Sequence, residues 1–526
     1  MKNKARSSYA DGVAVLTVSA IIVKLIGVCY KIPLVRLLGS QGMGYFNAAY
    51  DVYALLSIIS TTGLPVAVSV MMNQYKGQQK RIFMLSLSVF LTLGALGACA
   101  VFFLADQIAV WVGAPGAAQS LRFIAPAVLF ICLSGALRGY HQGQRNMVPT
   151  AISQVIEAAC KLLLGLTFAY IAILNQQGPM TTAAFAVLGL SAGTMLSAVY
   201  LIFTKKENSQ QASTGISYRV LLRQLLAVAF PVTLGAALSG LSKMIDLGLI
   251  MRRLQDIGFD ADTAVSLYGC YSAMVIPFYS AVPALFGSVA MPLIPHLAHA
   301  IEANNVQKQR ELLNSCFRLT ALISIPGAIG MGMISDCVLR LLYKGSDGLE
   351  VAIPLLLILS ISVPASCLIT ATNAILQAYM HPWLPMISMA IGCAVKAISL
   401  YCLAGVPSVG IMAAPISTLL CCTGIVLINL YAIGKHVPRF SFVTIWMRAI
   451  GISAISIGAA SLIKRMLSAR VQSNTLLIAV TVAAAVLLYM IFAYIFGLFR
   501  MSDIKPKKEK ELSSYGNSRN DQEIVV

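Results

Sequence analysis

The chain has 526 residues, of which 58% are hydrophobic and 11% charged, and its formal net charge is +19. A soluble domain carries about 25% charged residues, so this composition excludes an ordinary water-soluble enzyme. The positive charge does not indicate a nucleic-acid partner, because Lys and Arg occupy the gaps between apolar blocks and the carboxyl-terminal tail. The twelve cysteines form no CxxC pair, which argues against a disulfide framework.

The apolar blocks are about 20 residues long, which is the length of a helix that crosses a bilayer core of about 30 Å. We therefore predict an all-α integral membrane protein of about fourteen transmembrane helices. The first six lie near residues 12–36, 46–72, 82–105, 121–140, 149–174 and 181–203. Six more lie near residues 223–250, 264–291, 313–335, 352–379, 384–404 and 408–433, and the last two near 443–467 and 475–499.

This order of segments predicts the domains. Residues 1–203 form one six-helix lobe, 204–222 a cytoplasmic linker, 223–433 a second six-helix lobe, 434–500 helices 13 and 14, and 501–526 a cytoplasmic polar tail. A repeat supports two related lobes, because Leu137 to Tyr140, Pro149 and Lys161 recur as Leu376 to Tyr379, Pro385 and Lys396. Since each repeat has an even number of spans, the pseudo-twofold axis should follow the membrane normal and leave a central cleft.

Basic residues in the gaps give the orientation, because short cytoplasmic loops hold the excess of Lys and Arg. With both termini in the cytoplasm, the basic residues on the cytoplasmic side are Lys76, Lys80, Arg81, Arg138, Arg145, Lys205, Lys206, Arg219, Lys308, Arg310, Lys435, Arg439 and those of the tail. One loop does not fit this pattern, because Lys464, Arg465 and Arg470 would lie outside. The last hairpin is the one whose orientation the charges do not support.

Charged residues far from any loop are the candidate functional residues: Lys24, Lys31, Asp51, Glu157, Lys161, Lys243, Asp246 and Lys396. A lysine at the bilayer centre costs about 2.5 to 3.5 kcal/mol, so we expect these groups to line a wet cleft. By helical spacing Glu157 can pair with Lys161, and Lys243 can pair with Asp246. That pairing leaves Lys24, Lys31 and Lys396 as surplus positive charge. Snorkelling of Lys31 and Lys243 to the interface, and dry pairs that fix packing, are the structural alternatives.

A cationic cavity inside a membrane suits an anionic cargo, and a lysine binds phosphate as a point charge. The sequence lacks a Walker A motif, an HExxH motif and a GxSxG elbow, which favours a transporter without a cofactor over an enzyme. His296 and His299 form an HxxH pair, but two histidines without a third ligand are more typical of a solvated loop than of a metal site. We therefore expect a transporter of a phosphorylated cargo.

Three segments of the sequence carry a family resemblance: Val23 to Gly39 with Gly42 to Phe46, Gly63 to Ser69, and Met291 to Pro295 after the eighth helix. Together with the region of Tyr140, they resemble MurJ and stage V sporulation protein B type proteins of the multidrug/oligosaccharidyl-lipid/polysaccharide exporter superfamily. With the duplicated layout, the resemblance extends over nearly the whole chain. It implies two six-helix lobes around a cationic cavity, with helices 13 and 14 forming a groove for a lipid tail.

The resemblance also implies a function: a flippase that moves lipid II, the undecaprenyl-diphosphate-linked peptidoglycan precursor, across the bacterial cytoplasmic membrane by alternating access. Lys24 falls on a basic position of the family's cavity, Lys31 lies beside another, which here is Tyr30, and Arg36 matches a basic position at the end of helix 1. Positions near Ser57 and Tyr271 that are arginine in some members are not basic here, which places the chain nearer the Gram-positive branch. The expected partners are the polyprenyl-linked glycan, membrane lipids and cell wall synthesis proteins.

The candidate site residues are therefore of two kinds: the substrate-binding residues Lys24, Lys31, Arg36, Lys161, Lys243 and Lys396, and the coupling or ion-pair residues Asp51, Glu157 and Asp246. The membrane potential or an ion gradient is the expected driving force. Three alternatives remain open at this stage. They are a flippase for another polyprenyl-linked glycan, a multidrug cation antiporter, and a scaffold of a sporulation or division complex that transports nothing.

Overall fold

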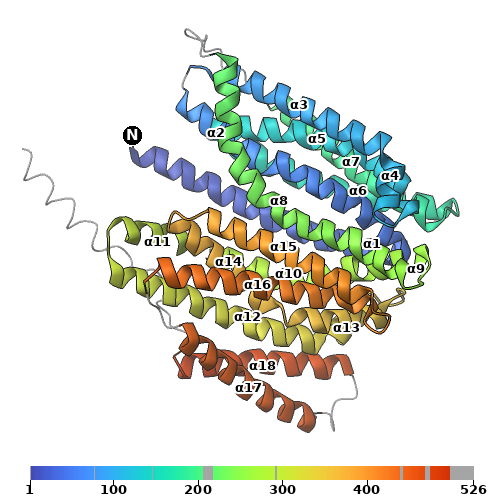
Figure 1. Ribbon diagram of the computed structural model, residues 1–526, viewed down its shortest axis with the longest axis vertical. Helices are drawn as coiled ribbons and strands as arrows, with labels where there is room; N and C mark the ends of the chain where they lie inside the picture. The colour runs from blue at the N-terminus through green and yellow to red at the C-terminus, as the bar shows by residue number, and fades with distance from the viewer. Residues whose placement is uncertain are drawn as a thin grey trace, which may run out of the picture. The chain divides into compact units, whose positions relative to one another are not determined.

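The computed structural model describes residues 2–75, 77–144, 146–204, 217–290, 293–438, 442–467 and 474–497. Over these ranges the chain is helical and contains no strand (Figure 1). The all-α prediction is confirmed. Parts of two predicted segments lie outside the described residues, namely 205–216 of the linker and the whole tail, as do the basic residues Lys76, Arg145, Lys205, Lys206, Arg439 and Arg470.

The helices form two compact units, and each contains several pieces of the sequence. The first unit comprises Met1–Ser280, Ser335–Ser362 and Trp383–Ile428. The second comprises Ala281–Ile334, Val363–Pro382 and Asn429–Val526. The two six-helix lobes, with their boundaries at 203 and 433, remain a prediction from the sequence.

The amino-terminal part of the first unit is a set of apolar helices packed side by side, with α3, α5, α6 and α7 adjacent (Figure 1). Its elements are α1 (Lys2–Thr61), α2 (Gly63–Gln74), α3 (Gln79–Phe103), α4 (Ala105–Trp111), η1 (Pro115–Ala117), α5 (Ala118–Gly143), α6 (Val148–Leu174) and α7 (Pro179–Phe203). For α3, α5, α6 and α7 the predicted starts and ends agree to within a few residues. The short polar segments between the apolar blocks are therefore enough to locate these four helices. Helix α2 is the end of the predicted span 46–72, and α4 and η1 were not predicted.

Helix α1 covers one whole predicted span and part of a second. Gly39 breaks the regular geometry inside α1, with φ 66° and ψ −175°. Only glycine adopts such a backbone angle without steric cost, so Gly39 permits the kink between the two predicted spans.

The remainder of the first unit and the second unit follow the same order as the predicted spans. The elements are α8 (Tyr218–Asp256), α9 (Ala261–Gly269), the π-helical turn η2 (Cys270–Val275), α10 (Ile276–Ala290), α11 (Leu293–Glu302), α12 (Val306–Leu342), α13 (Leu349–Ser360), α14 (Val363–Ala378), α15 (Trp383–Ala404), η3 (Gly410–Met412), α16 (Ala413–His436), α17 (Phe442–Leu467) and α18 (Asn474–Ile495). The predicted loop with His296 and His299 is instead the short helix α11.

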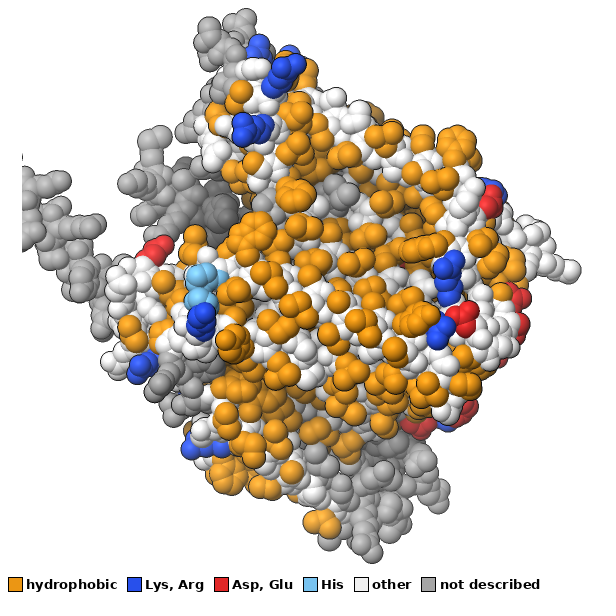
Figure 2. Space-filling view, viewed as in Figure 1, with side chains coloured by type: hydrophobic (Ala, Val, Ile, Leu, Met, Phe, Trp, Pro, Cys, Tyr) orange, Lys and Arg blue, Asp and Glu red, His pale blue; other side chains and the backbone are white. Residues whose placement is uncertain are grey.

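The described residues contain 11 helices long and apolar enough to cross a membrane, or 12 when the bent pair α13 and α14 counts as one span. The predicted count of fourteen is not confirmed. Two features account for the difference. The kinked segment Val15–Gln74 counts once although two spans were predicted there, and α18 contributes only the shorter apolar stretch Ala483–Ile495. In Figure 2, apolar side chains cover most of the visible surface, as expected for a protein whose solvent is lipid.

The start of α9 shows how local sequence fixes a helix boundary. Asp260 is the N-cap residue, and its carboxylate accepts hydrogen bonds from the backbone N–H of Thr263 at 3.0 Å and from the Thr263 hydroxyl at 2.6 Å. These bonds lower the pKa of the Asp260 carboxyl. The cap sets where α9 begins, and therefore which of its side chains face α1.

The second unit is held together by buried polar contacts and carries an apolar groove. Tyr379 donates to Gln309 at 2.8 Å, and the Asn429 amide donates to Thr372 at 2.9 Å and to Asn373 at 2.8 Å. The groove, with a cavity volume of about 30 Å³, lies between α12, α17 and α18. Its walls include Pro326, Ile329, Met333, Val486 and Tyr489.

Candidate functional site

Two charged residues of α1, Lys31 and Asp51, face α9 and η2 within the first unit. The Lys31 ammonium donates to the backbone carbonyl of Ser272 at 3.1 Å. Asp51 accepts a hydrogen bond from the Tyr268 hydroxyl at 2.6 Å. Both side chains are partly buried. Asn47 adds a third contact along this seam, because its amide donates to the Ser272 hydroxyl at 2.9 Å.

Lys161 of α6 lies among aromatic rings of α1. Its ammonium is 4.5 Å from the centroid of the Tyr50 ring and 5.1 Å from that of Tyr30. The predicted ion pair between Lys161 and Glu157 is wrong, since no carboxylate of the described residues lies within ion-pair distance of Lys161. A cation over an aromatic face is stabilised by the ring quadrupole without losing its charge. The Lys161 ammonium is therefore available to an anion.

These residues form one cluster of charges with Lys243 of α8. Lys31 lies within Coulombic range of Asp51, Lys161 and Lys243. Lys243 is exposed, whereas Asp51 and Lys161 are partly buried. The structure thus brings together four of the predicted site residues, from three helices. We call Lys31, Asp51, Lys161 and Lys243 the lysine cluster.

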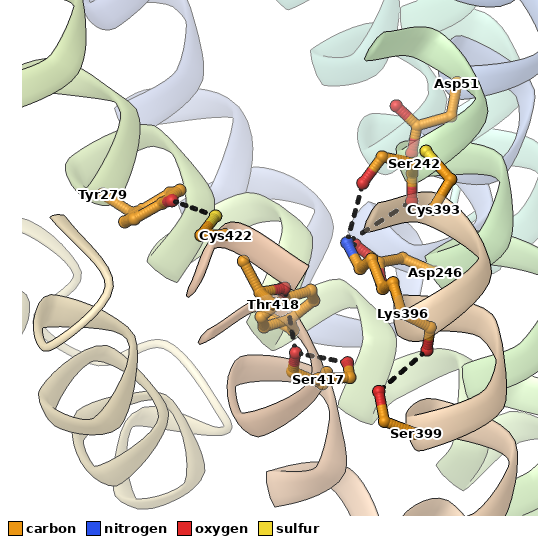
Figure 3. Close-up of polar contacts among 12 residues, drawn as sticks. Asp51, Ser242, Asp246, Tyr279, Cys393, Lys396, Ser399, Ser417, Thr418 and Cys422 are labelled. Atoms are coloured by element: carbon orange, nitrogen blue, oxygen red, sulfur yellow. Dashed lines mark hydrogen bonds and ion pairs between the residues drawn. The ribbon is translucent and has the colours of Figure 1, made fainter. Parts of the chain in front are cut away.

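Lys396 of α15 does not add free positive charge to this cluster. Its ammonium lies 2.7 Å from Asp246 Oδ2 and also donates to the Ser242 hydroxyl at 3.1 Å (Figure 3). The Lys396 and Asp246 side chains are only 4% and 9% exposed, so this is a dry pair between α15 and α8. The predicted pairing of Asp246 with Lys243 is wrong. The partner of Asp246 is Lys396, which comes from a helix far along the chain.

A second buried pair lies among α5, α6 and α7. The Arg138 guanidinium bonds to Glu157 at 2.8 Å, to Ser153 at 3.0 Å and to Ser197 at 3.1 Å. Arg138 was predicted to mark the cytoplasmic side, yet it lies inside α5 and is only 7% exposed. Glu157 is therefore neutralised by Arg138. The predicted coupling role for Glu157 stays a prediction.

The remaining predicted residues, Lys24 and Arg36, stand apart from the lysine cluster. Lys24 is exposed on α1 and forms no ion pair with any residue in the described ranges. Arg36 donates twice to the carbonyl of Leu342, at 2.7 and 3.0 Å. Leu342 is the last residue of α12, where carbonyls lack helical partners, so Arg36 caps that helix.

Four neutral residues complete the surroundings of these charges and were missed from the sequence: Tyr50, Ser242, Tyr268 and Ser272. Serine and tyrosine are common in any apolar helix, so composition gives no reason to select them. For Tyr50 the sequence offered one signal, namely that it directly precedes the intramembrane Asp51. In the structure Phe46 stacks on Tyr50, with ring centroids 6.0 Å apart.

Summed over the neighbouring groups, the charge of the region is positive. Four lysines (Lys31, Lys161, Lys243 and Lys396) face two carboxylates (Asp51 and Asp246) in the set of mutually interacting groups. Arg138 and Glu157 neutralise each other. The arrangement can therefore hold an anion with about two negative charges. The rings of Tyr30 and Tyr50 keep Lys161 from being fully hydrated.

Comparison with known proteins gives matches along most of the chain. The family model of the polysaccharide biosynthesis protein family matches residues 9–300, and the MatE model matches residues 262–402. The chain is 25% identical over 523 residues to stage V sporulation protein B of Bacillus subtilis strain 168, covering 95% of this chain and 98% of that protein. It is 24% identical over 420 residues to the lipid II flippase MurJ of the same organism, covering 74% and 76% respectively.

Solved structures with the same fold include a lipid II flippase MurJ in an inward closed conformation. The TM-score is 0.73 at 14% sequence identity, over 91% of this chain and 98% of that one. An inward-facing multidrug resistance MATE family transporter of the MOP superfamily gives a TM-score of 0.62 at 16% identity, over 84% and 98%. At these identities the likeness establishes the fold alone.

Proposed function

Because the chain belongs to the polysaccharide biosynthesis protein family, we propose that it is a flippase for a polyprenyl-diphosphate-linked glycan, and specifically for lipid II. The observation that carries this proposal is the lysine cluster. A diphosphate brings two or more negative charges, and the region has a net formal charge of two positive. Within the lysine cluster, none of the ammonium groups of Lys31, Lys161 and Lys243 has a carboxylate within ion-pair distance among the described residues.

The proposal narrows the set of substrate-binding residues. Lys31, Lys161 and Lys243 hold the diphosphate as point charges. Lys396 is assigned a packing role, because its charge is balanced by Asp246 at 2.7 Å. Arg36 is assigned a capping role at the end of α12.

The apolar groove of the second unit is the proposed site for part of the polyprenyl chain. Its lining is almost entirely hydrocarbon, and the Ser453 and Ser456 hydroxyls donate to backbone carbonyls of their own helix. Apart from the buried Tyr489 hydroxyl, this lining suits a lipid tail and offers little to a sugar or phosphate.

A cation exporter fits the cluster less well. A cationic drug would meet three unpaired ammonium groups, and like charges brought together repel. An anionic glycan lipid meets the opposite situation. Export of net negative charge also runs with an inside-negative membrane potential, gaining about 2.3 kcal/mol per charge per 100 mV. We propose the potential as the driving force, with alternating access as the mechanism.

The decisive experiment is reconstitution of the full chain in vesicles that contain fluorescent lipid II. Lipid II should flip faster in these vesicles than in vesicles without the protein. The rate should rise further under an imposed potential that is negative on the side from which lipid II departs. Lys161→Gln should slow flipping roughly 10- to 100-fold. Lys308→Gln, on a lysine whose side chain is 58% exposed, should leave the rate unchanged. If lipid II is not moved but another polyprenyl-diphosphate glycan is, the substrate differs. If neither moves, the proposal fails.

A further inference from the structure

Lys31 and Asp51 carry opposite charges within Coulombic range of each other, yet they form no ion pair. Each is bound instead by a neutral group from the neighbouring segment. The Tyr268 hydroxyl donates to Asp51 at 2.6 Å, and the Ser272 carbonyl accepts from Lys31 at 3.1 Å. Opposite charges in a medium of low dielectric attract strongly, so this separation needs a structural cause.

The segment that supplies both neutral partners is held firmly against α1. Ser272 lies in the π-helical turn η2, and its hydroxyl donates to the Tyr268 carbonyl at 2.8 Å while accepting from Asn47. Gly269 directly contacts the backbone of Ser40, because a Cβ there would overlap the Ser40 carbonyl oxygen. The backbone that carries Tyr268 is therefore held against α1 by packing at Gly269 and by the hydrogen bonds of Ser272.

We propose that Tyr268 is a positioning residue of the lysine cluster, which holds Asp51 away from Lys31 and Lys243. The inference rests on the proposed function, because its purpose is to keep those ammonium groups available for a diphosphate. With the hydroxyl bond intact, Asp51 is stabilised without an ammonium partner. Without it, Asp51 Oδ2 loses its donor and pairs with Lys31 or Lys243, and one positive charge of the site is lost.

The test is a pair of variants, Tyr268→Phe and the double variant Tyr268→Phe/Asp51→Asn, in the purified full chain. The probe is farnesyl diphosphate, with farnesol as the control without phosphate. Tyr268→Phe should weaken binding of farnesyl diphosphate about tenfold, the order of one charge-assisted hydrogen bond. The double variant should restore the affinity, because the amide cannot neutralise a lysine.

Tyr45→Phe is the matched control. Tyr45 donates to Asp262 at 2.6 Å, so Tyr45→Phe removes the same type of bond between the same two helices, α1 and α9. Neither Tyr45 nor Asp262 belongs to the lysine cluster. Tyr45→Phe should leave the affinity for farnesyl diphosphate unchanged. An unchanged affinity of Tyr268→Phe, or a loss that Asp51→Asn does not restore, would overturn the proposal.

A second measurement separates this inference from the proposed function. Acetic anhydride labels unpaired lysines, and mass spectrometry gives the extent of labelling at Lys31 and Lys243. Labelling of at least one of the two should fall in Tyr268→Phe and return in the double variant. If the wild-type chain fails to bind farnesyl diphosphate, the proposed function fails, and the labelling still decides the role of Tyr268. Equal labelling in the wild-type chain and both variants would contradict the positioning role of Tyr268.

Discussion

The ammonium of Lys396 lies 2.7 Å from Asp246 Oδ2, and both side chains are almost completely buried. The pair joins α15 to α8 across 150 residues of sequence. Asp246 Oδ1 is also buried and has no hydrogen-bond partner among the described residues. The carboxylate therefore depends on Lys396 for most of its stabilisation.

Removing one partner of this pair should destabilise the protein strongly. Lys396→Met leaves a buried carboxylate without its counter-charge, for which the expected cost is about 3 to 5 kcal/mol. The double variant Lys396→Met/Asp246→Leu should recover much of that loss, because two apolar side chains need no partner. The midpoint of thermal unfolding in detergent measures both effects.

The same double variant tests the packing role of Lys396. If that role is right, the double variant flips lipid II at close to the wild-type rate. A stable double variant that cannot flip would show instead that the ammonium contacts the substrate.

Arg138 should be difficult to replace. Its guanidinium bonds three side chains on two neighbouring helices, Ser153, Glu157 and Ser197. Lysine has the charge but lacks the planar fork of donors, so Arg138→Lys should lower stability by about 2 kcal/mol through lost hydrogen bonds.

The exposed pair of Arg122 with Asp106 is the comparison for Arg138, since its 2.6 Å contact is just as short. Its side chains are 43% and 63% exposed. Arg122→Lys should therefore change the unfolding midpoint little, by the equivalent of about 0.5 kcal/mol or less. Equal effects of the two substitutions would contradict a special role for burial at Arg138.

The sequence was a good guide to the helices and a poor one to the ion pairs. Helices such as α6 and α7 were placed closely, because the length of an apolar block is a local property that the bilayer dictates. Pairing was predicted from helical spacing, which gave Glu157 with Lys161 and Asp246 with Lys243. The observed partners, Arg138 and Lys396, come from other helices, and spacing within one helix carries no information about them.

The sequence selected all four members of the lysine cluster, but it did not show which intramembrane charges are compensated. Lys31, Lys161 and Lys243 were selected because a charge at bilayer depth is expensive. The same argument also selected Lys396, which is buried in an ion pair with Asp246. The free-energy cost of a charge at bilayer depth does not distinguish a charge that binds substrate from one that is already paired. Neutral partners such as Tyr268 and Ser272 carry no charge to draw attention to them, and only the packing of α9 against α1 reveals their role.

Lys161 should affect transport far more than stability. Its neighbours are the rings of Tyr30 and Tyr50, at 5.1 and 4.5 Å, so Lys161→Gln leaves no charge unpaired. The free energy of unfolding should fall by about 1 kcal/mol, the size of one or two cation–π contacts. The flipping rate should fall roughly 10- to 100-fold, as expected for the loss of a charge-assisted contact to phosphate.

Lys161→Arg is the informative companion to Lys161→Gln. Arginine keeps the charge and stacks on aromatic rings, so a large part of the flipping rate should return. A Lys161→Gln protein that flips lipid II normally would remove Lys161 from the proposed site.

Gly269 should tolerate no side chain, because α9 and α1 touch there through their backbones. A Cβ at Gly269 would overlap the carbonyl oxygen of Ser40 and lie 2.8 Å from the amide nitrogen of Gly44. Gly269→Val must push the helices apart, at a cost of about 1 to 3 kcal/mol for overpacking. The displacement also carries Tyr268 away from Asp51, so the affinity for farnesyl diphosphate should fall with stability.

Gly27→Ala is the matched substitution in open space, since a Cβ at Gly27 meets nothing within 4 Å. Alanine is the better helix former, so the free energy of unfolding of this variant should rise by about 0.5 to 1 kcal/mol. Its affinity for farnesyl diphosphate should stay unchanged. The comparison separates the general effect of losing a glycine from the specific effect of parting α9 from α1. If Gly269→Val bound farnesyl diphosphate as tightly as Gly27→Ala does, the α1 to α9 contact would not position the lysine cluster.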